Sequence, residues 1–329
     1  LKILTRSRDL KSKKNYSNLI LNKWIIKNNL PIFYATNNYK MINQFCRVIF
    51  SKESHYIYIN SLFSFWYSVF ILFIIFLFRK HKFHKIILAP RGELLEGALE
   101  FKKLKKQIYI KFFNLFLKDK IYKWHATSIN ESKSIKMHFN VENICDVPNL
   151  YPSVLENKKT DDYADHSVEP LKCIYLSRIT PKKNLLFIIK LLKCFYKFDL
   201  IFDIYGPLED LSYWEECKKE ILNLPQNIKI RYRGEVKHEN IKNTFNRYDL
   251  FLFPSKAENH GHVIYESLSS GTFAFVSNNI FIPDSLKEIV FSLTLKDEKV
   301  WIENLIKFYK EKKKLLGNKN YVINIYSNY

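Results

Sequence analysis

Glycine is scarce in this sequence, and the cysteine patterns of two common protein classes are absent. Only 7 of the 329 residues are glycine, whereas average usage of about 7% would give roughly 23. This scarcity excludes collagen-like chains, glycine-rich linkers and RGG-type segments. The five cysteines are widely spaced and include no C-x-x-C pair, which argues against a disulfide framework and a zinc site. We therefore expect a reducing, cytoplasmic environment.

Acidic residues are few in the first half of the chain. Residues 1–150 contain 26 Lys and Arg against 9 Asp and Glu, whereas residues 151–329 contain 27 against 23, and the formal net charge is +21. The excess positive charge of residues 1–150 attracts an anionic partner. Such a partner is a nucleic acid, an anionic membrane surface or a phosphorylated substrate. A lysine-biased composition that only loads solvated surfaces explains the charge equally well.

Long hydrophobic runs are also lacking, with one exception. Apolar residues make up 47% and aromatic residues 16% of the chain, which excludes global disorder. The exception is Leu62–Phe78, which as a helix would span about 26 Å, short of the roughly 30 Å hydrocarbon core of a membrane. The run follows a strand-like segment, and three serines share one helical face: Ser61, Ser64 and Ser68. We predict a crossover helix that is buried or lies against a membrane, rather than a transmembrane helix.

Short apolar runs alternate with helical periodicity, which predicts an α/β fold with parallel strands and crossover helices. The predicted strands are 3–5, 32–35, 56–60, 86–89 and 123–127 in a first domain, and 173–176, 201–205, 228–232, 250–253 and 274–276 in a second. Helix-like stretches, such as 185–195 and 214–222, separate the strands of the second domain. Polar residues and prolines in 151–170 predict a linker. We expect two Rossmann-like domains, 1–150 and 171–329, around a cleft, with ligands at the carboxyl ends of the strands.

Two acidic residues flank a predicted anion site in the second domain. Glu258 lies in the loop after an apolar strand, and Glu266 lies eight residues later in the next helix, so both can face one ligand. Gly261 allows the backbone to approach a phosphate closely. We expect the N–H groups of His262 and Val263 to point at that phosphate, with the helix dipole behind them.

Two cations follow another strand of the same domain. The segment SRITPKKN places Arg178 and Lys183 at a strand end, and YGPLED places Gly206 at the end of the next strand. A diphosphate leaving group gains negative charge as its bond to a sugar breaks. Two fixed cations would stabilise that charge selectively in the transition state.

The second domain contains four segments in a fixed order: SRITPKKN, YGPLED, RGEV and FPSKAENHGHVIYESLSSG. This series resembles the C-terminal half of the family 4 (group 1) retaining glycosyltransferases, which have the two-domain GT-B fold. Two segments of the first domain are similar to the acceptor domain of the same family: APRGELLEGALEFKKLKKQIY and WHATSINES. The resemblance spans about residues 1–290. It implies that a sugar moves from a nucleotide-diphosphate donor to a glycan or lipid-linked glycan, with retention of configuration, in cell-surface polysaccharide synthesis.

The resemblance also implies roles for individual residues. Arg178 and Lys183 would bind the donor diphosphate, Glu258 would lie by the transferred sugar, and Glu266 would accept hydrogen bonds from the ribose. The expected donor pocket comprises Gly206, Asn259, His260, Gly261, His262, Val263 and Glu266, and the acceptor side comprises Arg91, Gly92 and Glu93. The sequence contains no D-x-D pair, so we expect a metal-independent enzyme with no cofactor beyond its nucleotide-sugar substrate. We expect it in the cytoplasm, with peripheral attachment to the inner face of the membrane left open.

The sequence departs from the family pattern at two places. The E-x-F-G motif of the family is replaced by Glu258-Asn259-His260-Gly261, so His260 stands where an aromatic wall of the sugar pocket is usual. No glycine precedes Gly92, so the opening strand and glycine-rich loop of the first domain are not recognisable. We expect the chain to be a fragment without them, and to be weakly active or inactive.

Two rival functions remain open at this stage. A basic nucleic-acid-binding protein would bind DNA or RNA tightly, with a steep dependence on salt; we expect no nucleic-acid partner if the resemblance holds. A non-catalytic, membrane-associated GT-B relative would bind a sugar nucleotide without transferring it. The lysines before the apolar run 108–117 fit either anionic lipid headgroups or a solvated helix face: Lys102, Lys103, Lys105 and Lys106.

Overall fold

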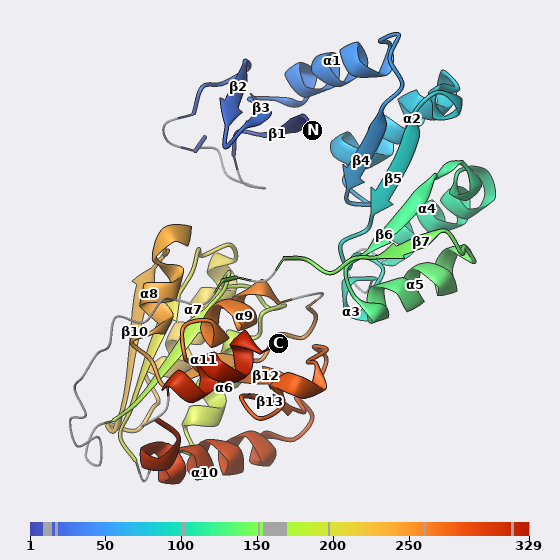
Figure 1. Ribbon diagram of the computed structural model, residues 1–329. Coiled ribbons are helices and arrows are strands. Elements are labelled where there is room, and N and C mark those ends of the chain that lie inside the picture. The colour runs from blue at the N-terminus through green and yellow to red at the C-terminus, as the bar shows by residue number, and fades with distance from the viewer. Residues whose placement is uncertain are drawn as a thin grey trace. The chain divides into compact units, whose positions relative to one another are not determined.

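The computed structural model describes residues 1–8, 15–16, 19–99, 103–150, 152–153, 170–196, 198–258, 261–316 and 319–328. The chain forms two compact units (Figure 1): unit 1 consists of Leu1–Leu94 and Leu99–Val147, and unit 2 of Leu95–Ala98 and Pro148–Tyr329. The predicted linker, residues 151–170, lies almost entirely outside the described residues.

Unit 1 begins with a three-stranded sheet in the order β1-β3-β2. β1 (Ile3–Arg6) pairs in parallel with β3 (Leu30–Ala35), and β2 (Trp24–Lys27) pairs with β3 as an antiparallel hairpin. The hairpin turns through Asn28 and Asn29, whose φ angles of 50° and 60° are those that a two-residue type I′ turn requires. The helix α1 (Asn38–Ile49) follows, and the Asn37 side chain caps it by accepting a hydrogen bond from the Lys40 N–H at 2.9 Å.

The second sheet of unit 1 is parallel throughout, in the order β4-β5-β6-β7. Its strands are β4 (Tyr56–Asn60), β5 (Lys85–Ala89), β6 (Lys123–Ala126) and β7 (Ile144–Asp146). The connections contain α2 (Phe70–Leu77), α3 (Glu96–Leu99), α4 (Lys103–Phe116) and α5 (Ile129–Phe139). The Trp124 ring is buried in the core, 5.7 Å from the Phe113 ring centroid and 4.7 Å from that of Phe139.

The long apolar run of unit 1 forms a single π-helical turn, η1 (Phe65–Val69), followed by α2. Four residues of α2 pack into the core: Ile71, Leu72, Ile74 and Ile75. The part of the chain that the structure describes contains no helix with the length and apolar character needed to cross a bilayer. The prediction of a packed crossover helix is therefore confirmed for the inner face of this segment.

Unit 2 contains one parallel sheet in the order β10-β9-β8-β11-β12-β13. Its strands are β8 (Leu171–Leu176), β9 (Leu200–Tyr205), β10 (Ile228–Gly234), β11 (Leu250–Phe253), β12 (Phe273–Ser277) and β13 (Val290–Leu293). The chain proceeds outward from β8 to β10, then returns to the other side of β8 and continues to β13. The strand order therefore reverses between β8 and β11, the switch point at which open α/β sheets bind ligands.

Four helices lie between strands of unit 2: α6 (Leu185–Leu192), α7 (Leu211–Ile221), α8 (Ile241–Phe245) and α9 (His262–Leu268). Two more follow the last strand, β13: α10 (Glu298–Leu316) and α11 (Lys319–Ser327). Short 3₁₀ turns occur at Lys80–Lys82, Lys118–Lys120, His238–Asn240 and Asp284–Leu286. Every residue of β11 and β12 is buried, as expected for apolar parallel strands that are covered on both faces.

The α/β prediction is confirmed, and the ten predicted strands are all present with ends that differ by at most two residues. Three further strands, β2, β7 and β13, were not predicted. The predicted helices 185–195 and 214–222 correspond to α6 and α7. Asp210 caps α7 by accepting a hydrogen bond from the Tyr213 N–H at 3.1 Å, which explains why this helix begins three residues before its apolar pattern does.

Candidate functional site

An ion pair at the switch point joins Lys183, in the loop after β8, to Glu258, in the loop after β11. The two loops are also joined by the Lys256 N–H, which donates to the Lys182 carbonyl at 3.0 Å. The side chains of Lys183 and Glu258 are only 10% and 20% exposed. The Lys183 ammonium lies 5.0 Å from the centroid of the Phe253 ring, a cation–π distance. The structure thus brings together two of the predicted site residues, held at the edge where ligands bind.

Arg178 also lies in the loop after β8, but it contacts a different acid. One guanidinium nitrogen donates to both carboxylate oxygens of Glu209, at 3.1 and 3.2 Å. Glu209 belongs to the loop after β9, and the Arg178 side chain is 54% exposed. Glu209 was missed in the sequence, although it stands in the segment YGPLED; the available signal was an acid placed after the strand next to that of Arg178.

Gly206 allows the loops after β8 and β9 to meet. Its φ is +134°, and a Cβ at this position would lie 1.9 Å from the Ser177 carbonyl oxygen. The Gly206 N–H donates to the Gly234 carbonyl at 2.8 Å, and its own carbonyl accepts from the Tyr232 hydroxyl at 2.8 Å. The end of β10 therefore fixes Gly206, which in turn sets the position of the backbone beside Arg178.

Gly261 begins α9 in the left-handed conformation, with φ +64°. A Cβ at this position would lie 2.9 Å from the tip of Ile264 and 3.4 Å from Cγ of Glu258, so Gly261 also leaves room for the Glu258 side chain. His262 is exposed and Val263 is half-buried in the first turn of α9. Asn259 and His260, two of the predicted donor-pocket residues, lie outside the described residues.

Glu266 lies on α9 and faces the segment after β10. Its side chain is 14% exposed, and the nearer carboxylate oxygen is 3.8 Å from Nδ1 of His238. Burial raises the pKa of Glu266, and the charges of His238 and Lys242 oppose this rise without cancelling it. Glu266 is thus a carboxylate kept partly desolvated next to two basic side chains.

Glu266→Gln is expected to raise the melting temperature at pH 7 to 8. Burial raises the pKa of Glu266 in the folded protein, so the folded state holds this proton more tightly than the unfolded chain does. Stability therefore falls as the pH rises from the pKa of the unfolded chain through the higher pKa of the folded protein. Glutamine does not ionise, so the gain should vanish below about pH 4, where the unfolded chain is also protonated. Thermal unfolding at pH 4 and pH 7.5 measures it. The exposed Glu303 on α10 supplies the control, Glu303→Gln; equal shifts in both variants would contradict the prediction.

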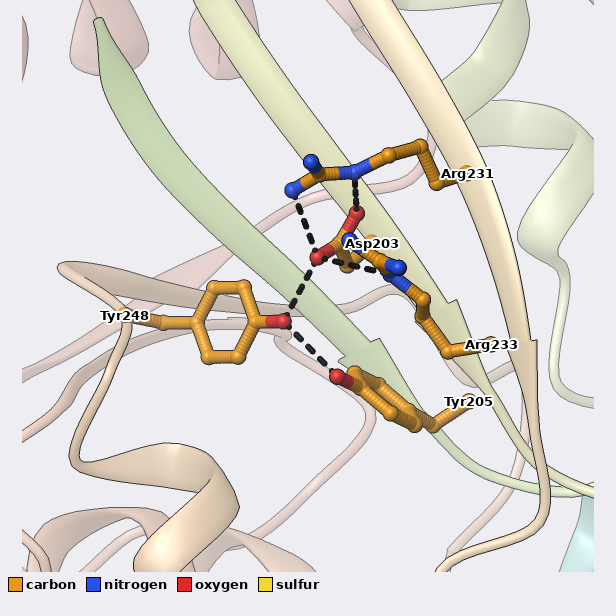
Figure 2. A network of polar contacts seen from close by, with 5 residues as sticks. All are labelled: Asp203, Tyr205, Arg231, Arg233 and Tyr248. Carbon is orange, nitrogen blue, oxygen red and sulfur yellow. Dashed lines mark hydrogen bonds and ion pairs between the residues drawn. The ribbon is translucent and has the colours of Figure 1, made fainter.

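A buried carboxylate, Asp203, organises the neighbouring strands β9 and β10 (Figure 2). Arg231 donates to its two oxygens at 2.6 and 2.9 Å, and Arg233 donates at 3.3 Å. The Tyr248 hydroxyl donates to Asp203 at 2.7 Å and lies 2.9 Å from the Tyr205 hydroxyl. Asp203 is 3% exposed in its side chain, whereas both arginines are nearly half exposed. The network was missed in the sequence, where an alternation of Asp203 and Tyr205 with apolar residues was its only sign.

Asp203→Asn is expected to lower the free energy of unfolding by about 2 kcal/mol, because hydrogen bonds to a charged acceptor are replaced by weaker ones. Asp199, exposed just before β9, provides the matched control: Asp199→Asn should change the free energy by no more than about 0.5 kcal/mol. Urea unfolding followed by circular dichroism measures both. Equal stability of the two variants would show that the network does not hold β10 in place.

The predicted acceptor-side residues lie in unit 1, after β5. Arg91 has a positive φ of 56° and donates to Asn60 Oδ1 at 2.5 Å and to the Tyr58 hydroxyl at 3.0 Å. The Gly92 N–H donates to the buried Glu131 at 2.5 Å. The Glu93 carboxylate accepts three hydrogen bonds from residues 61–63, at 2.6 to 2.9 Å. Glu93 therefore anchors the loop after β4, and its contact with an acceptor stays a prediction.

Arg91 belongs to a polar relay that was not predicted. The Tyr58 hydroxyl lies 2.5 Å from Nδ1 of His125, whose Nε2 lies 2.8 Å from the Val147 carbonyl. Because a carbonyl only accepts, the Nε2–H of His125 donates to Val147. In the neutral tautomer that carries this proton, Tyr58 would donate to Nδ1 and accept from Arg91. Burial raises the pKa of Tyr58, and Arg91 opposes the rise. In the described part of the chain, no group of three or more His, Cys, Asp or Glu residues is arranged to hold a metal ion.

Comparison with known proteins gives the class. The family model for glycosyl transferases group 1 matches residues 158–322, and the chain belongs to this family. No curated protein matches the sequence.

Solved structures share the fold. Anabaena Alr3699/HepE in complex with UDP and glucose is 14% identical with a TM-score of 0.65, covering 91% of this chain and 81% of that one. The pneumococcal O-GlcNAc transferase GtfA in complex with UDP and GlcNAc is 14% identical with a TM-score of 0.61, covering 93% and 66%. Sucrose-phosphate synthase from Thermosynechococcus elongatus is 10% identical with a TM-score of 0.66, covering 99% and 82%. The fold is thus that of GT-B glycosyltransferases.

Proposed function

We propose that this glycosyltransferase uses a nucleotide-diphosphate sugar, bound at the carboxyl edge of the unit 2 sheet with its diphosphate against Arg178 and Lys183. The observation that carries the proposal is the pairing of Lys183 with Glu258 across the switch point between β8 and β11. UDP is the first nucleotide to test, because two proteins of the same fold were solved with it.

Lys183 supports leaving-group stabilisation through its low exposure and its fixed position. A cation that is mostly shielded from water acts on a nearby phosphate more strongly than a solvated one, and it needs no reorganisation as charge develops. The ammonium has three N–H donors, so it can bind a phosphate oxygen and keep one contact with Glu258. Glu258 would then lie between the leaving group and the transferred sugar.

Arg178 is more exposed and would act as the adjustable partner. Its guanidinium already binds a carboxylate through one nitrogen, and the same group can bind two oxygens of a phosphate side by side. Glu209 would hold the side chain near the site until the donor arrives. Together the two cations would offset the charge of the diphosphate, which fits a metal-independent reaction.

The remaining donor contacts are proposed from the resemblance to the family and from the anion site expected at the start of α9. Glu266 would accept hydrogen bonds from the ribose hydroxyls, and the backbone at Gly261, His262 and Val263 would contact the phosphates. We further propose retention: the acceptor hydroxyl attacks from the face that the diphosphate leaves, and a donor phosphate oxygen takes its proton, so that no protein nucleophile is needed. The acceptor would be a glycan or lipid-linked glycan used in cell-surface polysaccharide synthesis, and unit 1 would bind it near Arg91. The enzyme would act in the cytoplasm.

A thermal-shift panel with UDP, GDP, CDP, ADP and dTDP tests the donor site first. One nucleotide should raise the melting temperature, since a ligand at a hundredfold excess over its Kd stabilises the folded state by about 2.7 kcal/mol. The sugars of that nucleotide are then tested for transfer and hydrolysis, and the anomeric proton of the product is assigned by NMR. If none of the five nucleotides shifts the transition and no donor is hydrolysed, the proposal is wrong.

A further inference from the structure

The outer face of α4, in unit 1, carries an apolar stripe. Five residues spaced three, four or one apart are each more than half exposed: Leu104, Ile108, Phe112, Leu115 and Phe116. The opposite side of the helix packs into the core through Ile110 and Phe113. A helix of a globular protein normally turns polar residues to the solvent, so a second apolar face indicates a partner.

The apolar surface continues over the neighbouring helical segment, η1 and α2. Its exposed members are Phe65, Trp66, Phe73 and Leu77. Near one end, the Phe63 ring centroid lies 5.7 Å from that of Tyr109 and 5.0 Å from the Lys106 ammonium. At the other end, the Lys120 ammonium lies 5.6 Å from the centroid of Phe76. The two segments therefore run side by side over one face of the sheet (Figure 1), and we call their outer surface the α2–α4 face.

The charges around the α2–α4 face are predominantly positive. Residues 54–92 contain no Asp or Glu, and neither does α4, whereas the exposed Asp119 lies in the turn that follows α4. The cations are Arg79, Lys80 and Lys82 after α2, and Lys103, Lys105, Lys106 and Lys111 on α4; Lys102 lies outside the described residues. A lysine can lay its methylene stem along apolar surface while its ammonium reaches the polar layer beside it.

We propose that the α2–α4 face binds the surface of an anionic lipid bilayer, with the exposed aromatic and aliphatic side chains at the boundary between headgroups and acyl chains, and with the lysines among the headgroups. Charge complementarity favours this occupant over a second copy of the chain, because a symmetric dimer through this face would place lysines against lysines, and these lysines far outnumber the nearby acid, Asp119. The inner residues of both helices belong to the core of unit 1, so the helices would lie on the membrane rather than enter it.

This attachment goes beyond the proposed donor site, which lies in unit 2, and does not depend on it. Apolar insertion and a basic patch supply the two signals that stable peripheral binding requires. The attachment would place unit 1, which is proposed to bind the acceptor, at the surface where a lipid-linked acceptor is found.

Vesicle flotation of the full chain tests the proposal. Vesicles of phosphatidylcholine alone are compared with vesicles containing 30% phosphatidylglycerol, at low and high salt. Leu104→Gln/Ile108→Gln/Leu115→Gln should lower the partition coefficient on anionic vesicles at least tenfold. Lys105→Gln/Lys111→Gln should lower it roughly twenty-five-fold, at about fivefold for each lysine near an anionic surface. All of these positions are exposed, so folding should be preserved, and thermal unfolding checks this.

Matched controls use residues of unit 2. Leu150→Gln/Leu211→Gln/Leu222→Gln removes three leucines that are 66% to 93% exposed, which is similar to the 68% to 76% of the three α4 residues. Lys296→Gln/Lys299→Gln removes two exposed lysines. Neither control should change the partition coefficient by more than about twofold. Absence of binding to anionic vesicles overturns the proposal, as does equal loss in test and control variants. A dimer in sedimentation equilibrium that the α4 variant dissociates would also overturn it, because a second copy would then occupy the face.

Discussion

Lys183→Ala is expected to lower turnover by about 10² to 10³, the scale observed when one preorganised charge-stabilising donor is removed from an active site. The ammonium is held by Glu258 and by the Phe253 ring, so it is in place before any donor binds. Alanine removes the cation from the leaving group and leaves Glu258 without its partner lysine. Initial rates of transfer with the nucleotide sugar identified in the panel measure the loss.

Two further variants separate the role of Lys183 from a general loss of charge. Lys190→Ala removes an exposed lysine of the adjoining helix α6 and should leave turnover within about twofold of the wild type. Lys183→Arg keeps the charge but changes its geometry, so it should recover part of the activity. Unchanged turnover in a folded Lys183→Ala protein would refute the assignment of Lys183 to the donor diphosphate.

Gly206→Ala is expected to destabilise the protein by at least about 4 kcal/mol, a size that marks a specific backbone conflict. A Cβ would lie 1.9 Å from the Ser177 carbonyl oxygen, so the loops after β8 and β9 would have to separate. The φ of +134° adds strain in a region that is almost restricted to glycine. Because Ser177 precedes Arg178, donor affinity should fall together with stability.

Gly234→Ala is the matched control for that substitution. Gly234 also has a positive φ, of +77°, but nothing lies within 4 Å of a Cβ added there. Its cost should be the left-handed strain alone, about 1 to 2 kcal/mol. Chemical unfolding of both variants, with nucleotide binding measured in parallel, decides between clash and strain. Equal costs at the two positions would show that the contact with Ser177 relaxes freely.

Much of the fold could be predicted because the buried strands have clear hydrophobic patterns in the sequence. β11 and β12 are continuous apolar runs, and β4 alternates between exposed tyrosines and buried isoleucines. β2 was missed because only one of its four residues is even half-buried, which leaves no apolar alternation. The pair Asn28-Asn29 was its remaining signal, since asparagine tolerates the positive φ of a type I′ turn.

The candidate site was predictable in its residues but not in its partners. Strand ends and residue types singled out Lys183 and Glu258, because the carboxyl ends of parallel strands meet along one edge. The pairing of Arg178 with Glu209 depends on which strands are neighbours and how the loops turn, which a single sequence does not state. Asp203 was missed for another reason. A buried carboxylate is costly without a cationic partner, and the register of β9 and β10, which a single sequence does not state, places Arg231 opposite Asp203.

An ammonium that already forms an ion pair with a carboxylate binds small anions from solution weakly. Chloride or inorganic phosphate at Lys183 would lie beside the negative charge of Glu258 and would make few other contacts. A whole nucleotide sugar brings a ribose and a base whose added contacts offset that repulsion. The empty protein should therefore ignore the abundant small anions around it and respond to its donor alone.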